Sequence, residues 1–484
     1  MYLGLDLGTS GVKAMLIDGD QTIVGSANGS LDVSRPHSGW SEQEPAHWVR
    51  ATEEAVAGLM AKHPKELAAV RGIGLSGQMH GATLIDAADK VLRPCILWND
   101  TRSHVEAAAL DADPRFRALT GNIVFPGFTA PKLAWVRQHE PDVFAKIAKV
   151  LLPKDYLRLW LTGEYISEMS DSAGTSWLDT GKRAWSSDLL AATHVSEEQM
   201  PTLVEGTQQA GMLRSELAAQ WGISGNVVVA GGAGDNAASA CGMGTVSDGA
   251  AFVSLGTSGV LFAANGSYLP KPESAVHAFC HALPNTWHQM GVILSATDAL
   301  NWHSGVTGKS AADLTGELGE TLKAPTGVTF LPYLSGERTP HNDAVIRGAF
   351  IGLEHESSRA VLTQAVLEGV AFAIRDNLEA LRSAGTGISR VTAIGGGSRS
   401  RYWLASIATA LGVSVDLPAD GDFGAAFGAA RLGLIAATGA DPIAVCTPPV
   451  TSGTIEPVSA LSGAYEEAYQ RYRALYPAIK SLAH

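Results

Sequence analysis

A six-residue sequence that occurs twice constrains the fold of this chain more than any other feature. Leu-Gly-Thr-Ser-Gly-Val at residues 7–12 recurs letter for letter at residues 255–260. Each copy lies between two short apolar runs, which for the first copy are residues 2–6 and 13–18. Glycine and small hydroxyl residues between such runs are typical of a β-hairpin turn with exposed backbone N–H groups. The repeat therefore predicts two similar domains, divided near residue 245.

Two such hairpins facing each other would form a clamp around a nucleotide. We expect backbone N–H groups of both turns to hold phosphates, with Lys13 adding positive charge. The residues concerned are Gly8, Thr9 and Ser10 in the first turn, and Gly256 and Thr257 in the second. Asp6 ends the first strand where the second copy has Ser254. An acid in an apolar strand is costly without a partner, so we expect Asp6 to hold Mg²⁺ through water. The alternative is that Asp6 only stabilises its own turn.

The rest of the chain predicts an α/β protein, because short apolar runs alternate with longer helical patterns. Strands are expected at residues 70–75, 82–85, 95–98, 227–230 and 391–394, and helices at 45–62, 357–381 and 422–434. Residues 110–210 are expected to form an insertion with its own helices. We therefore predict an N-terminal domain at 1–244 and a C-terminal domain at 245–484.

Composition and charge exclude several classes of function. The formal net charge of −13 argues against nucleic-acid binding. No run approaches the ~18 apolar residues of a membrane span, and the N-terminus lacks the pattern of a signal peptide, so we expect a cytoplasmic protein. The four cysteines show no C-x-x-C spacing and are expected to be buried free thiols. The oligomeric state stays open, with a homodimer as one option.

Two familiar nucleotide motifs are present only in part. Residues 72–77 satisfy G-x-G-x-x-G, but the sequence after them continues as a turn and a strand, where a dinucleotide-binding site requires a helix. Gly308-Lys309-Ser310 ends like a P-loop, but His303 stands where that motif requires glycine. These observations exclude a Rossmann site and a P-loop enzyme.

Asp235 is the candidate catalytic base. It follows four small residues, Gly-Gly-Ala-Gly at 231–234, and precedes a segment of small helix-forming residues. A carboxylate at such a junction is held rigidly, and glycines let a substrate approach the backbone. Asp is also a good helix N-cap, so the local sequence alone leaves both roles open.

Several segments together resemble the FGGY family of carbohydrate kinases, which includes glycerol, xylulose, ribulose, fuculose and gluconate kinases. Residues 6–13 resemble its opening D-x-G-T-[ST]-x-x-[KR], residues 98–102 its W-x-D-x-R segment, and residues 232–236 its G-x-x-D-[NQ] catalytic element. Residues 127–139 and 348–368 resemble its two signatures, except that Val361 stands where a polar residue is usual. The resemblance implies two duplicated actin-like (ribonuclease H-like) ATPase domains with an inter-domain cleft. It also implies ATP and Mg²⁺ as cofactors, and Asp235 as the general base.

Within this family, residues 76–81 are similar to the ketose kinases. Glycerol kinases place Arg-Glu where this chain has Met79 and His80. The resemblance therefore implies that Met79, His80, Asp235 and Asn236 contact a small ketose. It further implies an adenosine site formed by Gly396, Gly397, Ser400 and Asn301.

Three functions remain open at this stage: a ketose kinase, a kinase for another polyol or sugar acid on the same scaffold, and a non-catalytic ATP-driven binding module like actin or a heat-shock chaperone. The presence of Asp235 and of the Met79–His80 pair argues against the third.

Overall fold

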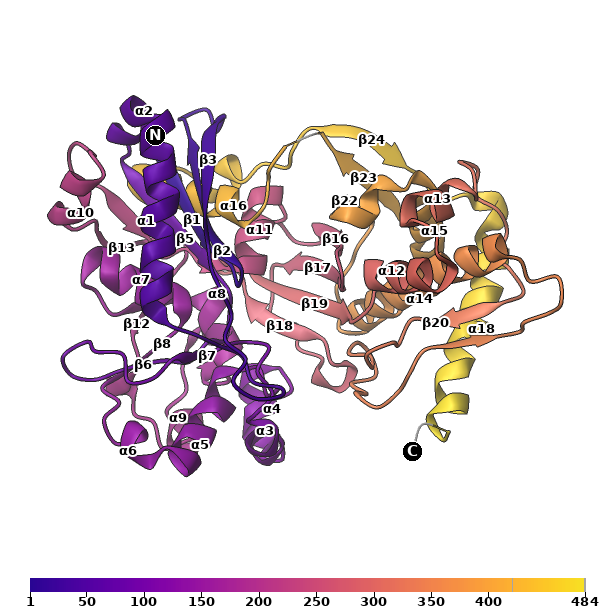
Figure 1. Ribbon diagram of the computed structural model, residues 1–484, viewed down its shortest axis with the longest axis horizontal. Helices are drawn as coiled ribbons and strands as arrows, with labels where there is room; N and C mark the ends of the chain where they lie inside the picture. The colour runs from indigo at the N-terminus through magenta and orange to yellow at the C-terminus, as the bar shows by residue number, and fades with distance from the viewer. Residues whose placement is uncertain (420, 483–484) are drawn as a thin grey trace.

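The first of two mixed β-sheets forms the centre of the N-terminal lobe in the computed structural model, which describes residues 1–419 and 421–482 (Figure 1). Its strand order is β13-β14-β5-β1-β2-β3, and β15 also pairs with β5. The strands are β1 (Tyr2–Leu7), β2 (Gly11–Ile17), β3 (Ile23–Ser30), β5 (Gly72–Gly77), β13 (Gln209–Met212), β14 (Val228–Ala230) and β15 (Ala233–Gly234).

The second sheet forms the centre of the C-terminal lobe, in the order β18-β19-β17-β16-β22-β23-β24. Its strands are β16 (Ala251–Leu255), β17 (Gly259–Asn265), β18 (His277–Cys280), β19 (Trp287–Ile293), β22 (Arg390–Ile394), β23 (Ser414–Pro418) and β24 (Thr451–Ile455).

The two sheets share one core topology. In the first, β1, β2 and β3 are antiparallel neighbours, while β5 runs parallel to β1 and β14 parallel to β5. In the second, β16, β17 and β19 are antiparallel neighbours, while β22 runs parallel to β16 and β23 parallel to β22. The repeated sequence forms the first hairpin turn of each sheet. The predicted duplicated, ribonuclease H-like fold is thereby confirmed.

Helices cover both faces of the first sheet. The helices α1 (Pro45–Lys62) and α7 (Pro153–Thr162) contribute leucines to the core on one face, and α11 (Asp235–Met243) and α16 (Ala425–Thr438) cover the other. A Cβ built on Gly4 would lie only 1.9 Å from the carbonyl oxygen of Ala426, so glycine in β1 permits the close approach of α16.

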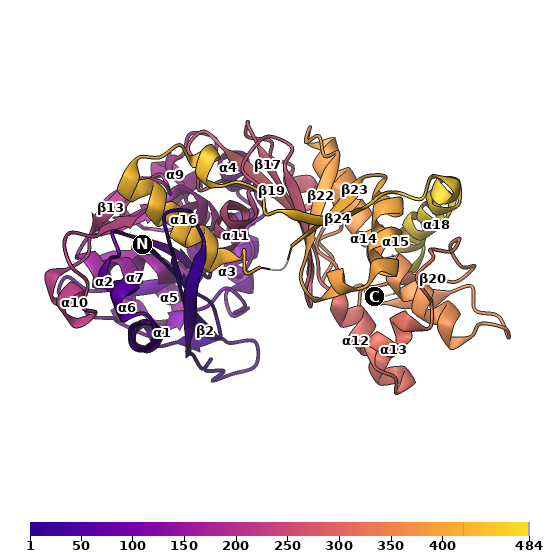
Figure 2. The same ribbon diagram turned by 90° about the horizontal axis from the view of Figure 1, so that it is seen from above.

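The helix α16 lies in sequence between β23 and β24 of the C-terminal sheet but packs against the N-terminal one (Figures 1 and 2). By packing, it belongs with the first lobe. The division near residue 245 remains a prediction, with this helix as a segment that returns across it.

The C-terminal lobe contains the largest single hydrophobic cluster of the described residues. Its helices include α12 (Thr297–Thr307), α14 (Arg359–Ser383), α15 (Arg401–Leu411) and α18 (Ser462–Lys480). The helix α18 buries three tyrosines, Tyr465, Tyr469 and Tyr472, against α14 and α15, and it ends at the far side of this lobe (Figure 1).

Residues 110–210 contain helices, as predicted, and also short strands. Besides α7, this part of the chain contains α4 (Pro114–Thr120), α5 (Thr129–His139), β9 (Ile166–Glu168), α8 (Met169–Ser172) and the short helix η1 (Ala173–Thr175). Because α7 packs on the central sheet, the segment is not wholly peripheral. It also meets the second lobe, since the Asn122 side chain exchanges two hydrogen bonds with the backbone of Ala278, at 2.9 and 3.0 Å.

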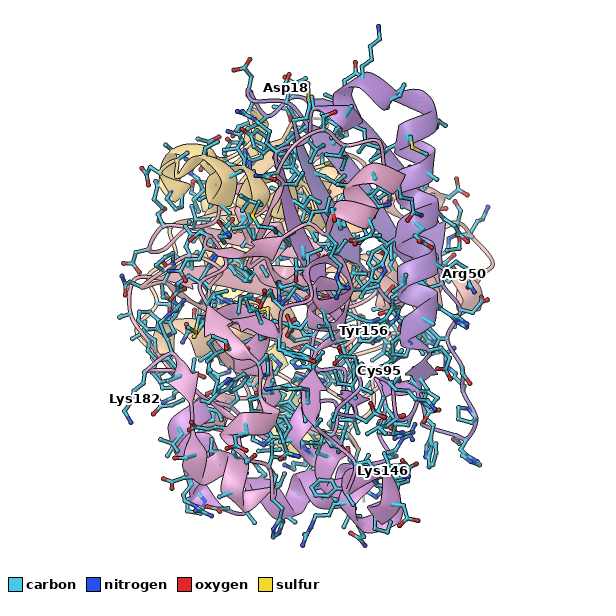
Figure 3. All side chains as sticks on the ribbon, turned by 90° about the vertical axis from the view of Figure 1, so that its left-hand side faces the viewer. Asp18, Arg50, Cys95, Lys146, Tyr156 and Lys182 are labelled. Atoms are coloured by element: carbon cyan, nitrogen blue, oxygen red, sulfur yellow. The ribbon has the colours of Figure 1, made fainter. Side chains whose placement is uncertain are left out.

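The predicted helix at 45–62 is confirmed residue for residue, whereas the strand predicted at 70–75 runs from Gly72 to Gly77. All four cysteines are buried and free, and Cys95 lies inside the lobe (Figure 3). Within residues 1–419 and 421–482, no helix has the length and apolar character needed to cross a membrane.

Candidate active site

Asp235 lies at the start of α11. The N-cap of this helix is Gly234, so the Asp235 carboxylate does not cap it. Instead, its Oδ1 accepts hydrogen bonds from the backbone N–H and the side-chain amide of Asn236, at 2.7 and 2.9 Å. Burial, together with the negative charge of Asp6, raises the pKa of Asp235 to about 6. The structure therefore supplies a carboxylate that is a stronger base than an ordinary Asp.

His80 has an unusual backbone conformation, with a φ of 70°. Its carbonyl oxygen accepts hydrogen bonds from Thr129 at 3.1 Å and from the Lys132 ammonium at 2.8 Å, and its ring stacks on Phe128 with 4.5 Å between centroids. Burial and the nearby Lys132 lower the pKa of His80 to about 3. The imidazole is therefore neutral at physiological pH, and its strained backbone is fixed by neighbours, as is common at functional sites.

The Nδ1 atom of His80 lies 2.7 Å from the carbonyl oxygen of Gly174. A carbonyl oxygen can only accept, so in a neutral ring Nδ1 carries the hydrogen and Nε2 has a free lone pair.

Met79 links this segment to the catalytic element. A Cβ built on Gly234 would lie 2.9 Å from Met79 Cγ, so the Met79 side chain packs directly beside the residue before Asp235. The structure thus brings together the four residues expected to contact a sugar.

The first hairpin turn is tied to the same segment. The Thr9 hydroxyl donates to the Gln78 side chain at 3.1 Å and accepts from the indole of Trp98 at 3.0 Å. Gln78 in turn donates to Gln43, whose amide bonds the carbonyl oxygen of Thr9 at 2.7 Å. Gln78 therefore connects the first hairpin turn, which is expected to hold phosphates, to Met79, its neighbour in sequence. Its place within the segment 76–81 was the one signal of this role in the sequence.

The second hairpin turn is tied to α12. The carbonyl oxygen of Gly256 accepts from the backbone and the hydroxyl of Thr297, at 2.9 and 2.7 Å. The helix α12 also carries Asn301, which lines a cavity of about 650 Å³ together with Gly396, Gly397 and Ser400. All four residues expected at an adenosine site therefore share one cavity. Ser400 also caps α15 by accepting from the backbone N–H of Trp403.

A second cavity of about 570 Å³ lies between the lobes. It is lined by Ser239 and Met243 of α11 and, from the other lobe, by residues that include Gly395, Ser398 and Arg399. Arg399 also lines the first cavity, so the two spaces adjoin. Lys13, expected to add charge at the phosphates, forms an ion pair with Asp422 at the edge of this space.

Asp6 has a buried Oδ1 atom that has no hydrogen-bond partner within the described part of the chain. Burial raises the pKa of this carboxyl. An unpartnered buried carboxylate oxygen is the kind of ligand that a hydrated divalent cation uses.

Sequence reasoning missed the residues that support these groups. Ser170 accepts a hydrogen bond from the Gly234 N–H at 3.1 Å, and the guanidinium of Arg158 donates to the carbonyl oxygen of Gly231. Neither residue belongs to a motif, and both lie more than 60 positions away from their partners in the chain.

Two duplicated domains, a glycine hairpin in each, and the half-buried Asp235 carboxylate at the lobe boundary define the class of protein: a carbohydrate kinase with an actin-like fold.

Comparisons with known proteins identify the family. Residues 1–242 match the N-terminal domain, and residues 251–437 the C-terminal domain, of the FGGY family of carbohydrate kinases. The chain is 48% identical over 486 residues to a xylulose kinase of Escherichia coli (strain K12), with 100% of both chains covered.

Solved structures agree. The crystal structure of a xyloylose kinase from Brucella ovis is similar with a TM-score of 0.99 and 74% sequence identity, covering 99% of both chains. That of a xylulose kinase from Rhodospirillum rubrum has a TM-score of 0.92 and 30% identity, covering 100% of this chain and 99% of the other. The chain belongs to the FGGY family of carbohydrate kinases.

Proposed function

We propose that this kinase transfers the γ-phosphoryl group of ATP to the terminal 5-hydroxyl of D-xylulose, with Asp235 as the general base. The observation that carries the proposal is the packing of Met79 against Gly234, which puts the ketose-kinase motif beside the candidate base. Full-length relatives named as xylulose kinases support the substrate.

Asp235 orients the 5-hydroxyl toward the γ-phosphorus and accepts its proton. With a pKa of about 6, most Asp235 is ionised at pH 7. It remains a far weaker base than an alkoxide, so proton transfer comes late, as the bond to phosphorus forms. Closure of the lobes would exclude water, which otherwise competes as an acceptor.

His80 accepts a hydrogen bond from a sugar hydroxyl. Its Nε2 lone pair cannot pair with the ketose carbonyl, because a carbonyl oxygen has no hydrogen to donate. The hydrogen bond from His80 Nδ1 to the Gly174 carbonyl oxygen supports a hydroxyl partner rather than the ketose carbonyl. A site that contains such a buried acceptor discriminates against analogues that leave it unpaired.

The nucleotide is held from both lobes. We assign the phosphates to the backbone N–H groups of the two hairpin turns and the adenosine to the cavity lined by Asn301, Gly396, Gly397 and Ser400. Lys13 would exchange Asp422 for a phosphate oxygen. Asp6 fits a hydrated Mg²⁺, which would offset charge on the phosphates.

The test is Asp235→Asn, with Asp376→Asn as a matched control. Asp376 is also a buried acid, but it bonds Tyr469 in the other lobe. We expect the Asp235 variant to lose roughly 10²–10⁴ in kcat, while calorimetry shows sugar binding largely kept. The control should turn over normally. Near-normal turnover by the Asp235 variant would refute the assignment of the base.

A further inference from the structure

One short segment reaches both ends of the proposed sugar site. Residues 168–174 comprise the end of β9, the helix α8 and the start of η1. They lie on the side of the first lobe that faces the second (Figure 1). At one end, the Ser170 hydroxyl accepts the Gly234 N–H at 3.1 Å. At the other, the carbonyl oxygen of Gly174 lies 2.7 Å from His80 Nδ1.

Ser170 is held in one orientation. Its hydroxyl donates to Glu168, whose oxygens lie 2.9 and 3.1 Å away, so its lone pairs are left for the Gly234 N–H. Glu168 also accepts the backbone N–H groups of Ser170 and Asp171, at 2.7 and 2.9 Å. The segment is thereby folded around one buried carboxylate.

A cluster of fully buried charges lies beside this carboxylate. Lys154, Arg158, Glu168 and Asp171 have 0% exposure, and Asp155 has 1%. Lys154 Nζ lies 2.6 Å from Asp155, 3.4 Å from Asp171 and 3.6 Å from Glu168. Burying five ionisable groups has a large desolvation cost, so such a cluster is weak evidence for a role that is purely stabilising.

The cluster also reaches the catalytic element directly. One guanidinium nitrogen of Arg158 donates to the carbonyl oxygen of Gly231, while the other bonds Asp155 at 2.8 Å. The glycine-rich stretch before Asp235 is therefore held at its first residue by Arg158 and at its last by Ser170.

At the other end of the segment, Gly174 packs closely against His80 and Met79. A Cβ at this position would lie 2.4 Å from His80 Cε1, 2.5 Å from His80 Nδ1 and 3.0 Å from Met79 Cε. Any side chain here would displace both residues of the Met79–His80 pair.

We propose that residues 168–174 are the positioning element of the sugar site, with Ser170 fixing Asp235 and Gly174 fixing His80. This inference rests on the proposed roles of Asp235 and His80. Through this element, the 110–210 region would set the distance between Asp235, which contacts the reacting hydroxyl of the sugar, and His80, which binds a hydroxyl at its other end.

Ser170→Ala and Ser167→Ala form the matched test. Ser167 is also fully buried, donates to a cluster carboxylate, Asp155, at 2.6 Å, and lies 2.8 Å from the Ser172 hydroxyl of the same segment. Its side chain makes no hydrogen bond to residues 231–235 within the described chain, so the pair of variants tests the contact to the catalytic element itself. Ser170→Ala should lower kcat by about 10- to 100-fold, because a small misplacement of the base is enough for that loss, with sugar KM within about twofold. Ser167→Ala should lose similar thermal stability and keep its kcat. Ser170→Thr, which keeps the hydroxyl, should recover most of the rate.

Gly174→Ala should show the opposite split, with sugar KM raised by about tenfold or more and kcat changed less. Equal kcat for the two serine variants, or loss of the same kinetic parameter in Ser170→Ala and Gly174→Ala, would overturn the inference. Failure of the base assignment would be seen separately, as an active Asp235→Asn enzyme.

Discussion

The pH dependence of turnover provides a quantitative test of the base. With a pKa of about 6, Asp235 is half protonated near pH 6, and the protonated form cannot accept the hydroxyl proton. At pH 5 only about a tenth of the enzyme would carry the ionised base, whereas an ordinary Asp would be about nine-tenths ionised. We therefore expect kcat/KM for the ketose to fall roughly tenfold between pH 7.5 and pH 5.

The assay is initial rates at saturating ATP and Mg²⁺ with excess coupling enzymes. Activity after brief incubation at pH 5 and return to pH 7.5 controls for unfolding. In Mg²⁺-free enzyme, where no cation offsets the Asp6 charge, Asp6→Asn should lower the pKa of Asp235, because the Asp6 charge is the second cause of the raised pKa. The shift should be partial, since burial, the larger cause, remains. If kcat/KM of the wild-type enzyme fell only near pH 4, the assignment of a raised pKa to the catalytic Asp235 would be refuted.

Three further predictions concern other parts of the molecule. Thr257 is exposed, so Thr257→Val should weaken ATP binding about fivefold, the value of one hydrogen bond, without changing the melting temperature. Thr9→Val should lower both the ATP affinity and the melting temperature, since Thr9 also bonds Gln78. Unchanged calorimetric affinity for ATP in both variants would mean that the repeat is merely structural. His80→Ala should raise KM and reduce the preference for D-xylulose over D-ribulose, and an unchanged kcat/KM ratio would contradict its role. Burial raises the pKa of Glu368 from 4.5 to about 8, so its contribution to stability is full below pH 4.5, is lost as pH rises to about 8, and changes little above that. Glu368→Gln should therefore flatten the decline in melting temperature from pH 5 to 8, whereas the exposed Glu356→Gln should not.

Much of the fold followed from local patterns. The repeated turn, the helix at 45–62 and the strand at 390–394 have apolar spacings and turn residues that determine their structure nearly alone. The return of α16 to the first lobe did not follow. Its small residues show that something packs closely against it, but only tertiary structure shows that the partners are β1, β5 and α11.

The site divides in the same way. Asp235, Met79 and His80 lie in motifs whose sequence context points to chemistry, and the structure brings them together. The raised pKa of Asp235 depends on burial and on Asp6, which is distant in sequence. Ser170 acts through a single backbone hydrogen bond across 64 positions, and no local pattern encodes such a contact.

The central claim is most directly tested by the substrate preference of the wild-type enzyme. An ADP-coupled assay should compare kcat/KM for D-xylulose, D-ribulose, L-ribulose, glycerol and gluconate under one set of conditions. We predict the highest value for D-xylulose and a poor value for glycerol, because we expect its three carbons to be too few to contact both Asp235 and His80. A higher kcat/KM for any of the other four would contradict the proposed substrate and leave only membership of the family.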